Sequence, residues 1–473
     1  MDYEEENMSF NIKSLELKEN YTFDVIVEDG EERFIAKLEL APERISLTIR
    51  GEINEERNYS FGWGNIDQLT CHDVNKTFIL YNLKFTHGQS NVLSHYPKYN
   101  AYFETTFDVS FLIYSESSFD DSFCSIDIHS DAISKWVGNT ETQEEIIDSY
   151  HRKEAIFNSP DKLQEFNISI NGIGILGVAY NLSMHSSSPD FKSGINFPPS
   201  LIYQFSNEIS GIKMEQEFEK TYNLLAFLFG NDFIINKVNV LNTYRKRCSL
   251  YYPSRKLWPQ YGNRLIFYPL GKDIRFNTLD IPSLSLEVFN TYFSLSSIES
   301  GYWKKYIKYK RMHNIEEQFL GFFRILETLS FKKKHFLDEA ILASVCSKAE
   351  PYLIKKFGDK KNVKFFVKGL SRYNESKYNT EKNIQDFYLS LPKIITAQWE
   401  FDKNSIGLIC KLRNDMTHAN DYYLDESEIY AKTKFIEVLL IISMCKKIGI
   451  SLSDLEKVIN RIDGYHLLIK EQI

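Results

Sequence analysis

Apolar and polar residues alternate through the first half of the chain. From about Thr22 to Ser183 the apolar positions recur every second residue, in the runs 23–25, 34–40, 45–49, 78–85 and 103–114. Clusters of glycine, asparagine, aspartate and proline separate these runs. A period of two places successive side chains on opposite faces of a strand, so the pattern predicts antiparallel sheets with one buried face.

The segments that follow mix helical and strand-like patterns. The polar stretch 140–154 predicts a short helix or a loop, and apolar residues at helical spacing predict a helix over 211–229. Strand-like runs return at 233–240 and 265–268. We therefore expect a β-rich N-terminal sensing domain over 1–210 and a connecting region of one helix and strands over 211–280.

After Pro282 the apolar period changes to 3.6. One stripe consists of Ile315, Phe319, Phe322, Leu326 and Leu329, and further helices are predicted at 336–357, 361–371, 382–399, 404–418, 427–447 and 452–468. Proline is nearly absent beyond this point. The pattern predicts a domain boundary within 275–285 and an all-α domain over 281–473, giving an α+β multidomain protein.

One glycine-rich motif resembles a nucleotide-binding loop. The sequence Gly172–Gly177 fits GxGxxG, but that motif requires a helix directly after it, so that the helix N-terminus meets the pyrophosphate. Here residues 178–183 continue as a strand and 186–189 form a turn. A closely packed strand is the favoured interpretation.

Composition describes a globular chain without a targeting segment. Of its 473 residues 43% are hydrophobic and 15% aromatic, which excludes a disordered protein. The acidic start MDYEEEN is no signal peptide, and the longest apolar run, 438–445, is too short to span a membrane. The six cysteines form no CxxC pair, so free thiols are expected, with no metal or other cofactor. We predict a cytoplasmic protein.

Charge is distributed unevenly between the halves. Residues 281–473 contain 30 Lys and Arg against 24 Asp and Glu, whereas 1–280 contain 26 against 40. The acidic first half would repel nucleic acid, and the mildly basic second half could hold it.

The segment Lys411–Asn420 carries the candidate chemistry. Arg413 and His418 follow an apolar helical run and are separated by four residues. A solvated helix end with a terminal histidine is one interpretation of such a pair. The other is a catalytic site, because histidine transfers protons near neutral pH and arginine offers a planar, permanently charged fork to phosphate oxygens.

The pair resembles the active-site motif of the HEPN family, in which an arginine precedes a histidine by a few residues and is often followed by asparagine. Helix 319–329 is similar to the helix that packs beneath this motif. The N-terminal region, with Phe61-Gly62-Trp63-Gly64 and Leu69-Thr70-Cys71, is similar to the first domain of ApeA-type anti-phage proteins.

This resemblance implies a metal-independent endoribonuclease. Arg413 and His418 would be catalytic, with Asn414 fixing the scissile phosphate or orienting His418, and Lys411 contacting the RNA. Asp415 would serve the helix structurally. Cleavage by the 2′-OH would leave a 2′,3′-cyclic phosphate. Host RNA, possibly tRNA, would be cut in abortive infection once the N-terminal half senses a phage-derived trigger.

Helix geometry places a condition on this site. Five residues along a helix correspond to a rotation of about 140°, so Arg413 and His418 point apart unless the helix ends near His418. A second subunit could instead complete the site, as HEPN ribonucleases usually arrange, and we predict a homodimer through the helical domain. Glu327 is either a surface carboxylate or a buried one that pairs with Arg413.

Two stretches combine basic and aromatic residues that could hold RNA. One is Trp303–Arg311, with Lys304, Lys305, Lys308 and Arg311 as substrate-binding candidates, and the other runs from Tyr244 to Trp258. Solvated surface is the alternative for both. The competing hypothesis for the whole protein is a non-catalytic HEPN module that binds RNA, a nucleotide or a partner protein.

Overall fold

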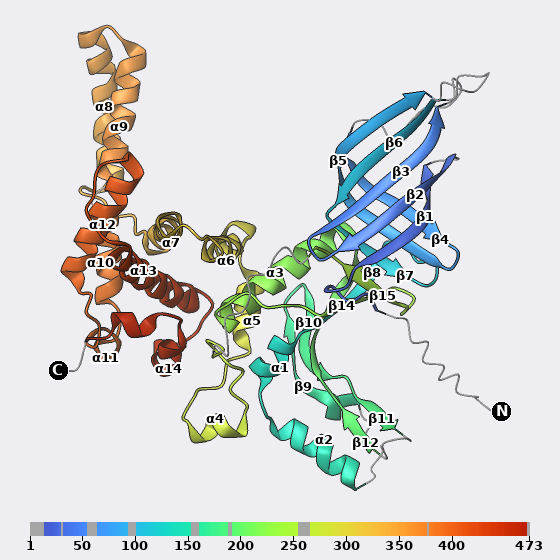
Figure 1. Ribbon diagram of the computed structural model, residues 1–473. Helices are drawn as coiled ribbons and strands as arrows, with labels where there is room; N and C mark the ends of the chain where they lie inside the picture. The colour runs from blue at the N-terminus through green and yellow to red at the C-terminus, as the bar shows by residue number, and fades with distance from the viewer. Residues whose placement is uncertain are drawn as a thin grey trace. The chain divides into compact units, whose positions relative to one another are not determined.

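A computed structural model of the chain describes residues 14–29, 32–53, 64–92, 101–152, 160–187, 192–253, 265–375 and 378–470 (Figure 1). The chain divides into two compact units, Met1–Ser294 and Leu295–Ile473. The first is β-rich and the second is helical, as the change of apolar period predicts.

Six strands of the N-terminal unit close into a ring. Their order is β4 (Ile66–Asp73), β1 (Tyr21–Asp29), β2 (Glu32–Ala41), β3 (Arg44–Ile53), β6 (Ala101–Val109) and β5 (Lys76–Val92), and β5 pairs again with β4. The ring closes because the long strand β5 pairs with β4 at its start and with β6 towards its end. An irregularity between Phe85 and His87 and a positive φ of 52° at Asn82 accompany this change of partner.

The sheet continues from β5 through β7 (Phe111–Ser115), β15 (Arg247–Tyr251), β14 (Lys237–Asn242), β8 (Phe123–His129), β13 (Pro199–Ile209), β10 (Gly174–Tyr180) and β9 (Gln164–Ile170). Strands β11 (Ser183–Ser187) and β12 (Lys192–Asn196) form a separate pair. The unit's helices are α1 (Asp131–Val137), α2 (Glu141–His151), a 3-10 turn η2 (Pro160–Leu163), α3 (Gly211–Phe229), α4 (Ile274–Thr278) and α5 (Glu287–Ser294). The prediction of a helix over 211–229 is confirmed.

The glycine-rich motif begins in the turn before strand β10 and continues into that strand. Gly174–Tyr180 forms β10 between β9 and β13. A Cβ at Gly174 would lie 1.8 Å from the Gln204 carbonyl oxygen, so only glycine allows this approach of the two backbones. The interpretation as a packed strand is confirmed.

Three strand predictions in this unit are wrong in detail. The run 103–114 is two strands, because the chain turns at Ser110 between β6 and β7. In 233–240 only the part from Lys237 is a strand. Residues 265–268 are not a strand either: the backbone of Phe267 and Tyr268 donates to the last carbonyls of α3, at Phe229 and Leu228. Tertiary packing accounts for the apolar pattern there.

The boundary between the two compact units, at Ser294 and Leu295, lies later in the chain than the change of apolar period after Pro282. Helix α5 belongs to the N-terminal unit because Phe289 packs against Trp136 and Phe166, with ring centroids 6.4 and 5.9 Å away. The division into 1–210, 211–280 and 281–473 concerns domains rather than compact units and stays a prediction.

The C-terminal unit is built from α6 (Ser297–Lys310), α7 (Ile315–Ser330), α8 (Glu339–Phe357), α9 (Lys360–Asn374), α10 (Thr380–Leu389), α11 (Lys393–Thr396), α12 (Lys403–His418), α13 (Glu426–Lys447), α14 (Leu452–Val458) and the 3-10 turns η3 (Ile459–Arg461) and η4 (Tyr465–Leu468). The helix predicted over 382–399 is two, since Pro392 interrupts it. The last predicted helix ends at Val458 and continues as 3-10 turns. Among the described residues, no helix combines the length and apolarity that crossing a membrane requires.

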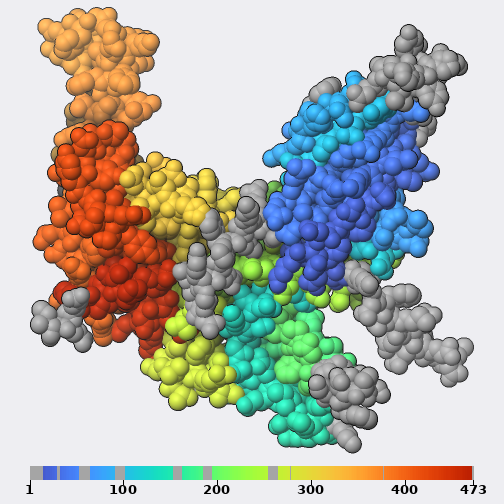
Figure 2. Space-filling view, in the orientation of Figure 1, coloured from blue at the N-terminus to red at the C-terminus, as the bar shows by residue number. Residues whose placement is uncertain are grey.

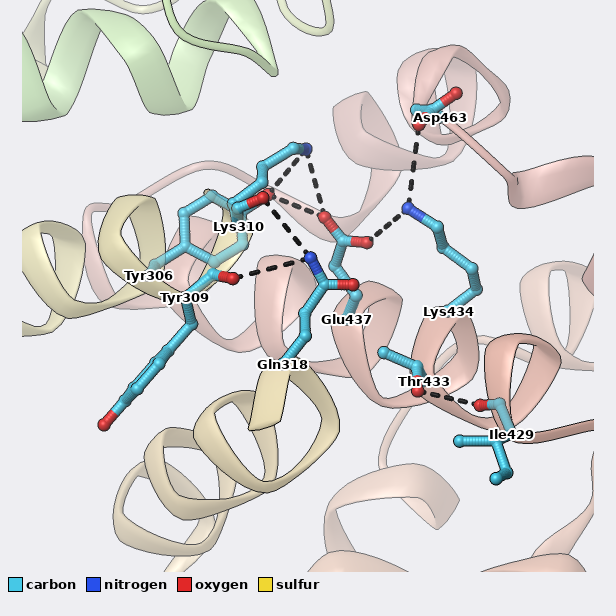
Figure 3. A network of polar contacts seen from close by, with 9 residues as sticks. All are labelled: Tyr306, Tyr309, Lys310, Gln318, Ile429, Thr433, Lys434, Glu437 and Asp463. Atoms are coloured by element: carbon cyan, nitrogen blue, oxygen red, sulfur yellow. Dashed lines mark hydrogen bonds and ion pairs between the residues drawn. The ribbon is translucent and has the colours of Figure 1, made fainter. Parts of the chain in front are cut away.

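Helix α13 forms the centre of this unit and contributes Glu437 and Lys434 to a buried charged cluster (Figure 3). Glu437, whose side chain is 1% exposed, accepts hydrogen bonds from Tyr306 and Lys310 on one oxygen, both at 3.0 Å, and from Lys434 on the other at 2.8 Å. Burial alone would raise the pKa of Glu437, but the two lysines outweigh burial and lower it to about 2. A buried carboxylate with every bond satisfied fixes α6 against α13.

Helices α8 and α9 form a hairpin that extends from the rest of the helical unit (Figure 2). Few side chains are buried within it: those of the two helices are Cys346, Val363 and Asn374. Large apolar residues along it are exposed, including Ile341, Tyr352, Phe365, Phe366 and Tyr373. The hairpin therefore contributes little to the core of the unit.

Candidate functional site

Helix α12 presents Arg413, Asn414 and His418 on its last two turns. Asp402 caps its start by accepting hydrogen bonds from the backbone of Asn404 and Ser405, both at 2.9 Å. The helix packs on α7 and α10 and buries Ile406, Ile409, Cys410 and Leu412. The apolar run before the motif thus anchors the helix and leaves the motif at its free end.

The helix ends immediately after His418. Ala419 adopts a left-handed conformation with φ of 53°, and the backbone N–H groups of Ala419 and Asn420 both donate to the Asp415 carbonyl oxygen. This is the usual way in which a helix terminates, although glycine is the usual residue at the left-handed position. The Asp415 side chain also accepts a hydrogen bond from the Asn420 amide at 3.2 Å.

Arg413 is held on one side by α7. Its Nη2 donates to Oε2 of Glu327 at 2.9 Å, and its guanidinium lies over the Phe323 ring, 5.4 Å from the centroid. Oε1 of Glu327 accepts a hydrogen bond from the Thr380 hydroxyl at the start of α10. The side chains of Arg413 and Glu327 are 27% and 29% exposed. Glu327 therefore pairs with Arg413, as one of the two sequence interpretations predicts, while remaining open to solvent.

His418 lies at the exposed end of the helix. Within the residues that the structure describes, it forms no hydrogen bond or ion pair. Residues 413 to 418 are helical throughout, so the rotation of about 140° between Arg413 and His418 applies. One chain does not bring the two side chains together.

Two neighbours of the motif have defined contacts. Nη1 of Arg413 donates to the Asn414 amide oxygen at 3.0 Å, so Asn414 contacts the arginine rather than His418. Lys411 is exposed about two turns before His418. Asp415 takes part in the helix end through its backbone carbonyl and its side chain.

The basic stretch on α6 is divided between surface and core. Lys304, Lys305, Lys308 and Arg311 are exposed. Trp303 and Tyr306 are buried on the face by which α6 packs, so these two aromatic side chains are not available to stack on bases. The role of these four basic residues in RNA binding stays a prediction.

In the second stretch Tyr244, Arg245, Lys246 and Arg247 are exposed, whereas Tyr251 is buried. Tyr252 is partly buried and packs on Phe218, with ring centroids 4.8 Å apart. Arg255, Lys256 and Trp258 lie outside the described residues, as does most of the Phe61–Gly64 element.

Phe323 and Thr380 are site residues that sequence reasoning did not identify. Phe323 lies one helical turn before Glu327 on α7, so the spacing of four could have suggested it. Thr380 lies between Arg413 and Glu327 in the sequence, on a third helix, and no local pattern marks it.

The cysteine beside Arg413 is a structural residue. Burial, together with the nearby carboxylates of Glu381 and Glu327, raises the pKa of the Cys410 thiol to about 12, against a smaller lowering by Arg413. A neutral thiol is a poor nucleophile. In the described part of the chain no group of three His, Cys, Asp or Glu side chains is placed to hold a metal ion.

Two family models match the chain. ApeA N-terminal domain 1 matches residues 18–280, and Apea-like HEPN matches residues 320–454. The first match covers more than half of the 473 residues, and the second includes Glu327, Arg413 and His418. No curated protein and no solved structure matches the chain.

Proposed function

Because this chain belongs to the ApeA-type HEPN proteins of anti-phage defence, we propose that its helical unit is a metal-independent endoribonuclease. The observation that carries the proposal is the state of Arg413. Glu327 and Phe323 fix the guanidinium at the surface beside the free end of α12, where His418 is exposed. An oriented arginine and an exposed histidine at the same helix end are residue types suited to phosphate chemistry.

The proposed reaction is an internal transfer. The 2′-oxygen of a ribose attacks the adjacent phosphorus as a histidine removes the 2′-OH proton, and the new 2′-O–P bond replaces the P–O5′ bond. A second proton donor protonates the leaving 5′-oxygen. The products are a 2′,3′-cyclic phosphate and a free 5′-hydroxyl. Arg413 stabilises the charge that develops on the phosphate oxygens.

This scheme needs both a base and an acid, and one chain provides one histidine at the motif. A homodimer that places His418 and His418 of the partner subunit at one cleft would supply both base and acid. It would also overcome the rotation of about 140° within a single helix, because Arg413 could act with the partner's His418. Host RNA, possibly tRNA, is the proposed substrate, and a phage product sensed by the N-terminal unit is the proposed trigger.

A specific observation also supports the competing function, a binding module without catalysis. Arg413 forms a hydrogen-bonded ion pair with Glu327, and such a pair can be purely structural. This alternative assigns no chemical role to His418.

The deciding experiment compares RNA from phage-infected cells that express the full chain or its His418→Ala variant. The ribonuclease predicts new cleavage sites with cyclic phosphate ends in the first sample alone. The purified, activated protein should cut RNA in excess EDTA. Growth arrest that persists in His418→Ala without new RNA ends would favour the binding module.

A further inference from the structure

The hairpin of α8 and α9, taken together with the segment that leads into it from α7, contains the whole positive excess of the helical region. Residues 331–375 hold 11 Lys and Arg against 5 Asp and Glu, an excess of six. Residues 281–473 hold 30 against 24, which is also an excess of six. The remainder of the region is therefore neutral, with 19 of each sign. A polyanion attracted to this half of the chain would be attracted to the hairpin.

Within the hairpin, α9 contains no acidic residue. Its basic residues are Lys360, Lys361, Lys364, Lys368 and Arg372, and all five are exposed. Among the described residues no carboxylate forms an ion pair with any of them. Ordinary solvated helices intersperse both signs, which avoids a field of one sign. A row of cations without counter-charges is typical of a surface that meets phosphates.

Three of these lysines form a line. Lys360, Lys364 and Lys368 are spaced by four residues, so they project from one side of α9 about 6 Å apart along its axis. The exposed apolar residues Phe366 and Tyr373 lie on another side, Phe366 at about 160° of rotation from Lys364. A ligand can therefore occupy the lysine row without covering the apolar stripe.

The base of the hairpin is fixed beside the candidate active site. Asn374 is buried, and it accepts a hydrogen bond from the Leu337 backbone at 2.8 Å and donates to the Leu337 carbonyl at 3.0 Å. Asn383 of α10 accepts from the Lys332 backbone at 3.1 Å. The hairpin thus begins directly after α7, the helix that carries Glu327, and is held against α10, the helix that carries Thr380.

We propose that the lysine row of α9 binds the sugar–phosphate backbone of the RNA that is cleaved at the Arg413–His418 site. The choice of RNA as the polyanion rests on the proposed ribonuclease function. Contacts from lysine to phosphate do not depend on the base sequence of the RNA. The lysine row therefore selects RNA that is long enough to lie along α9 and to reach the Arg413–His418 site. Short oligonucleotides would miss it.

The test measures the affinity of a stem-loop RNA for the full-length protein in the His418→Ala background, so that binding is separated from cleavage. We expect the triple variant Lys360→Glu, Lys364→Glu and Lys368→Glu to bind at least about tenfold more weakly, since each lost phosphate contact weakens binding and reduces the salt slope by about 1. The slope of log K against log salt should become shallower by about 3. Exchange of the same lysines to Arg should preserve both values.

In the matched control, three exposed lysines of the same unit that lie outside the hairpin are changed to Glu: Lys393, Lys403 and Lys446. This variant should bind the RNA within about twofold of the affinity of the parent protein. Circular dichroism confirms folding, and a Lys→Gln triple repeats the test should the Glu triple unfold. Unchanged affinity and slope would overturn the proposal. A triple variant that keeps its RNA affinity but no longer self-associates would also overturn it, because the lysine row would then bind a second copy of this chain. If the wild-type protein binds RNA through the lysine row yet never cleaves it, the proposed function fails, and the assignment of the row as an RNA-binding surface stands without the link to cleavage.

Discussion

Two carboxylates of the C-terminal unit bind cationic side chains in opposite surroundings. Glu437 on α13 is 1% exposed and meets Lys310, Lys434 and Tyr306, so both of its oxygens have partners inside the core. Glu327 on α7 is 29% exposed and meets Arg413 and Thr380 at the surface. The first cluster joins helices, and the second leaves a guanidinium edge open to solvent.

The difference separates stability from chemistry. Removing one member of a buried ion pair leaves the other charge without solvent or partner, which destabilises the fold strongly. Removing one member of a half-exposed pair lets water take its place, so the effect on folding is small. A carboxylate that orients a surface arginine can therefore be changed with loss of activity and little loss of stability. The following variants test this division.

Glu437→Ala should have the largest effect on folding. It leaves Lys310 and Lys434 buried without their common partner, and we expect a loss of about 3–5 kcal/mol in the free energy of unfolding. Denaturant titration measures it. Asp386→Ala, which removes the surface pair with Lys382, is the control and should change stability by about 0.5 kcal/mol or less. Equal effects of the two variants would contradict the assignment.

The same carboxylate should make the fold sensitive to acid. Its folded pKa, about 2, lies below the unfolded value of about 4.3. A lowered carboxylate pKa contributes stability above the unfolded value, and that contribution is lost as the pH falls towards the folded value. Stability attributable to Glu437 should therefore decline between about pH 4.3 and pH 2, and Glu437→Gln should show a flatter profile over this window. An identical slope of stability against pH in both proteins would argue against a charged Glu437 in the buried cluster.

Arg413→Ala should lower the cleavage rate by about 10²–10³, the range found when one donor to a developing oxyanion is removed. Arg413→Lys should recover only part of the rate, because a point charge lacks the bidentate fork and does not stack on Phe323 in the same way. Both variants should stay within about 1 kcal/mol of wild-type stability. Full activity in either folded variant would show that the arginine is structural.

Glu327→Gln should have an intermediate effect. The amide oxygen can still accept from Arg413, but the charge assistance is lost, which amounts to about 1.5 kcal/mol or roughly tenfold in rate. The fall should appear in kcat more than in KM, since the guanidinium is still present but less well oriented. Glu317→Gln, an exposed position near the start of the same helix, is the control. A change confined to KM would point to a direct role in RNA binding instead.

The smallest effect concerns the residue that ends α12. Ala419 adopts a left-handed conformation that is unfavourable for any residue with a Cβ. Ala419→Gly should stabilise the protein by about 1 kcal/mol or less, raise the melting temperature slightly and preserve cleavage. A lower melting temperature would mean that the helix end is held by contacts of the methyl group.

Much of the fold follows from local sequence. The period of two in β2 buries Phe34, Ala36, Leu38 and Leu40 in strict alternation, and the stripe of α7 buries Phe319, Phe322 and Leu326. The runs that mislead, at 265–268 and 103–114, are those whose apolar residues pack on a distant element or are divided by a turn. Periodicity reports burial, and burial does not specify which element covers a residue.

The candidate site divides in the same way. The Arg–Asn–His spacing is local and visible in the sequence, whereas Thr380 reaches Glu327 only because α10 packs on α7. The charge of the α8–α9 hairpin is also visible, but averaging over 281–473 conceals that residues 331–375 carry all of it. Counting charges helix by helix rather than over the whole domain would have distinguished the basic hairpin from the neutral remainder of the domain.

His418 is proposed to perform chemistry and to contribute nothing to folding. The most direct test measures His418→Ala for both RNA cleavage rate and melting temperature, beside wild type. Loss of a general acid–base group should lower the rate by about 10²–10⁴. The melting temperature should stay unchanged, because the side chain is exposed and forms no hydrogen bond among the described residues. A folded His418→Ala protein that cleaves RNA at the wild-type rate would contradict the account.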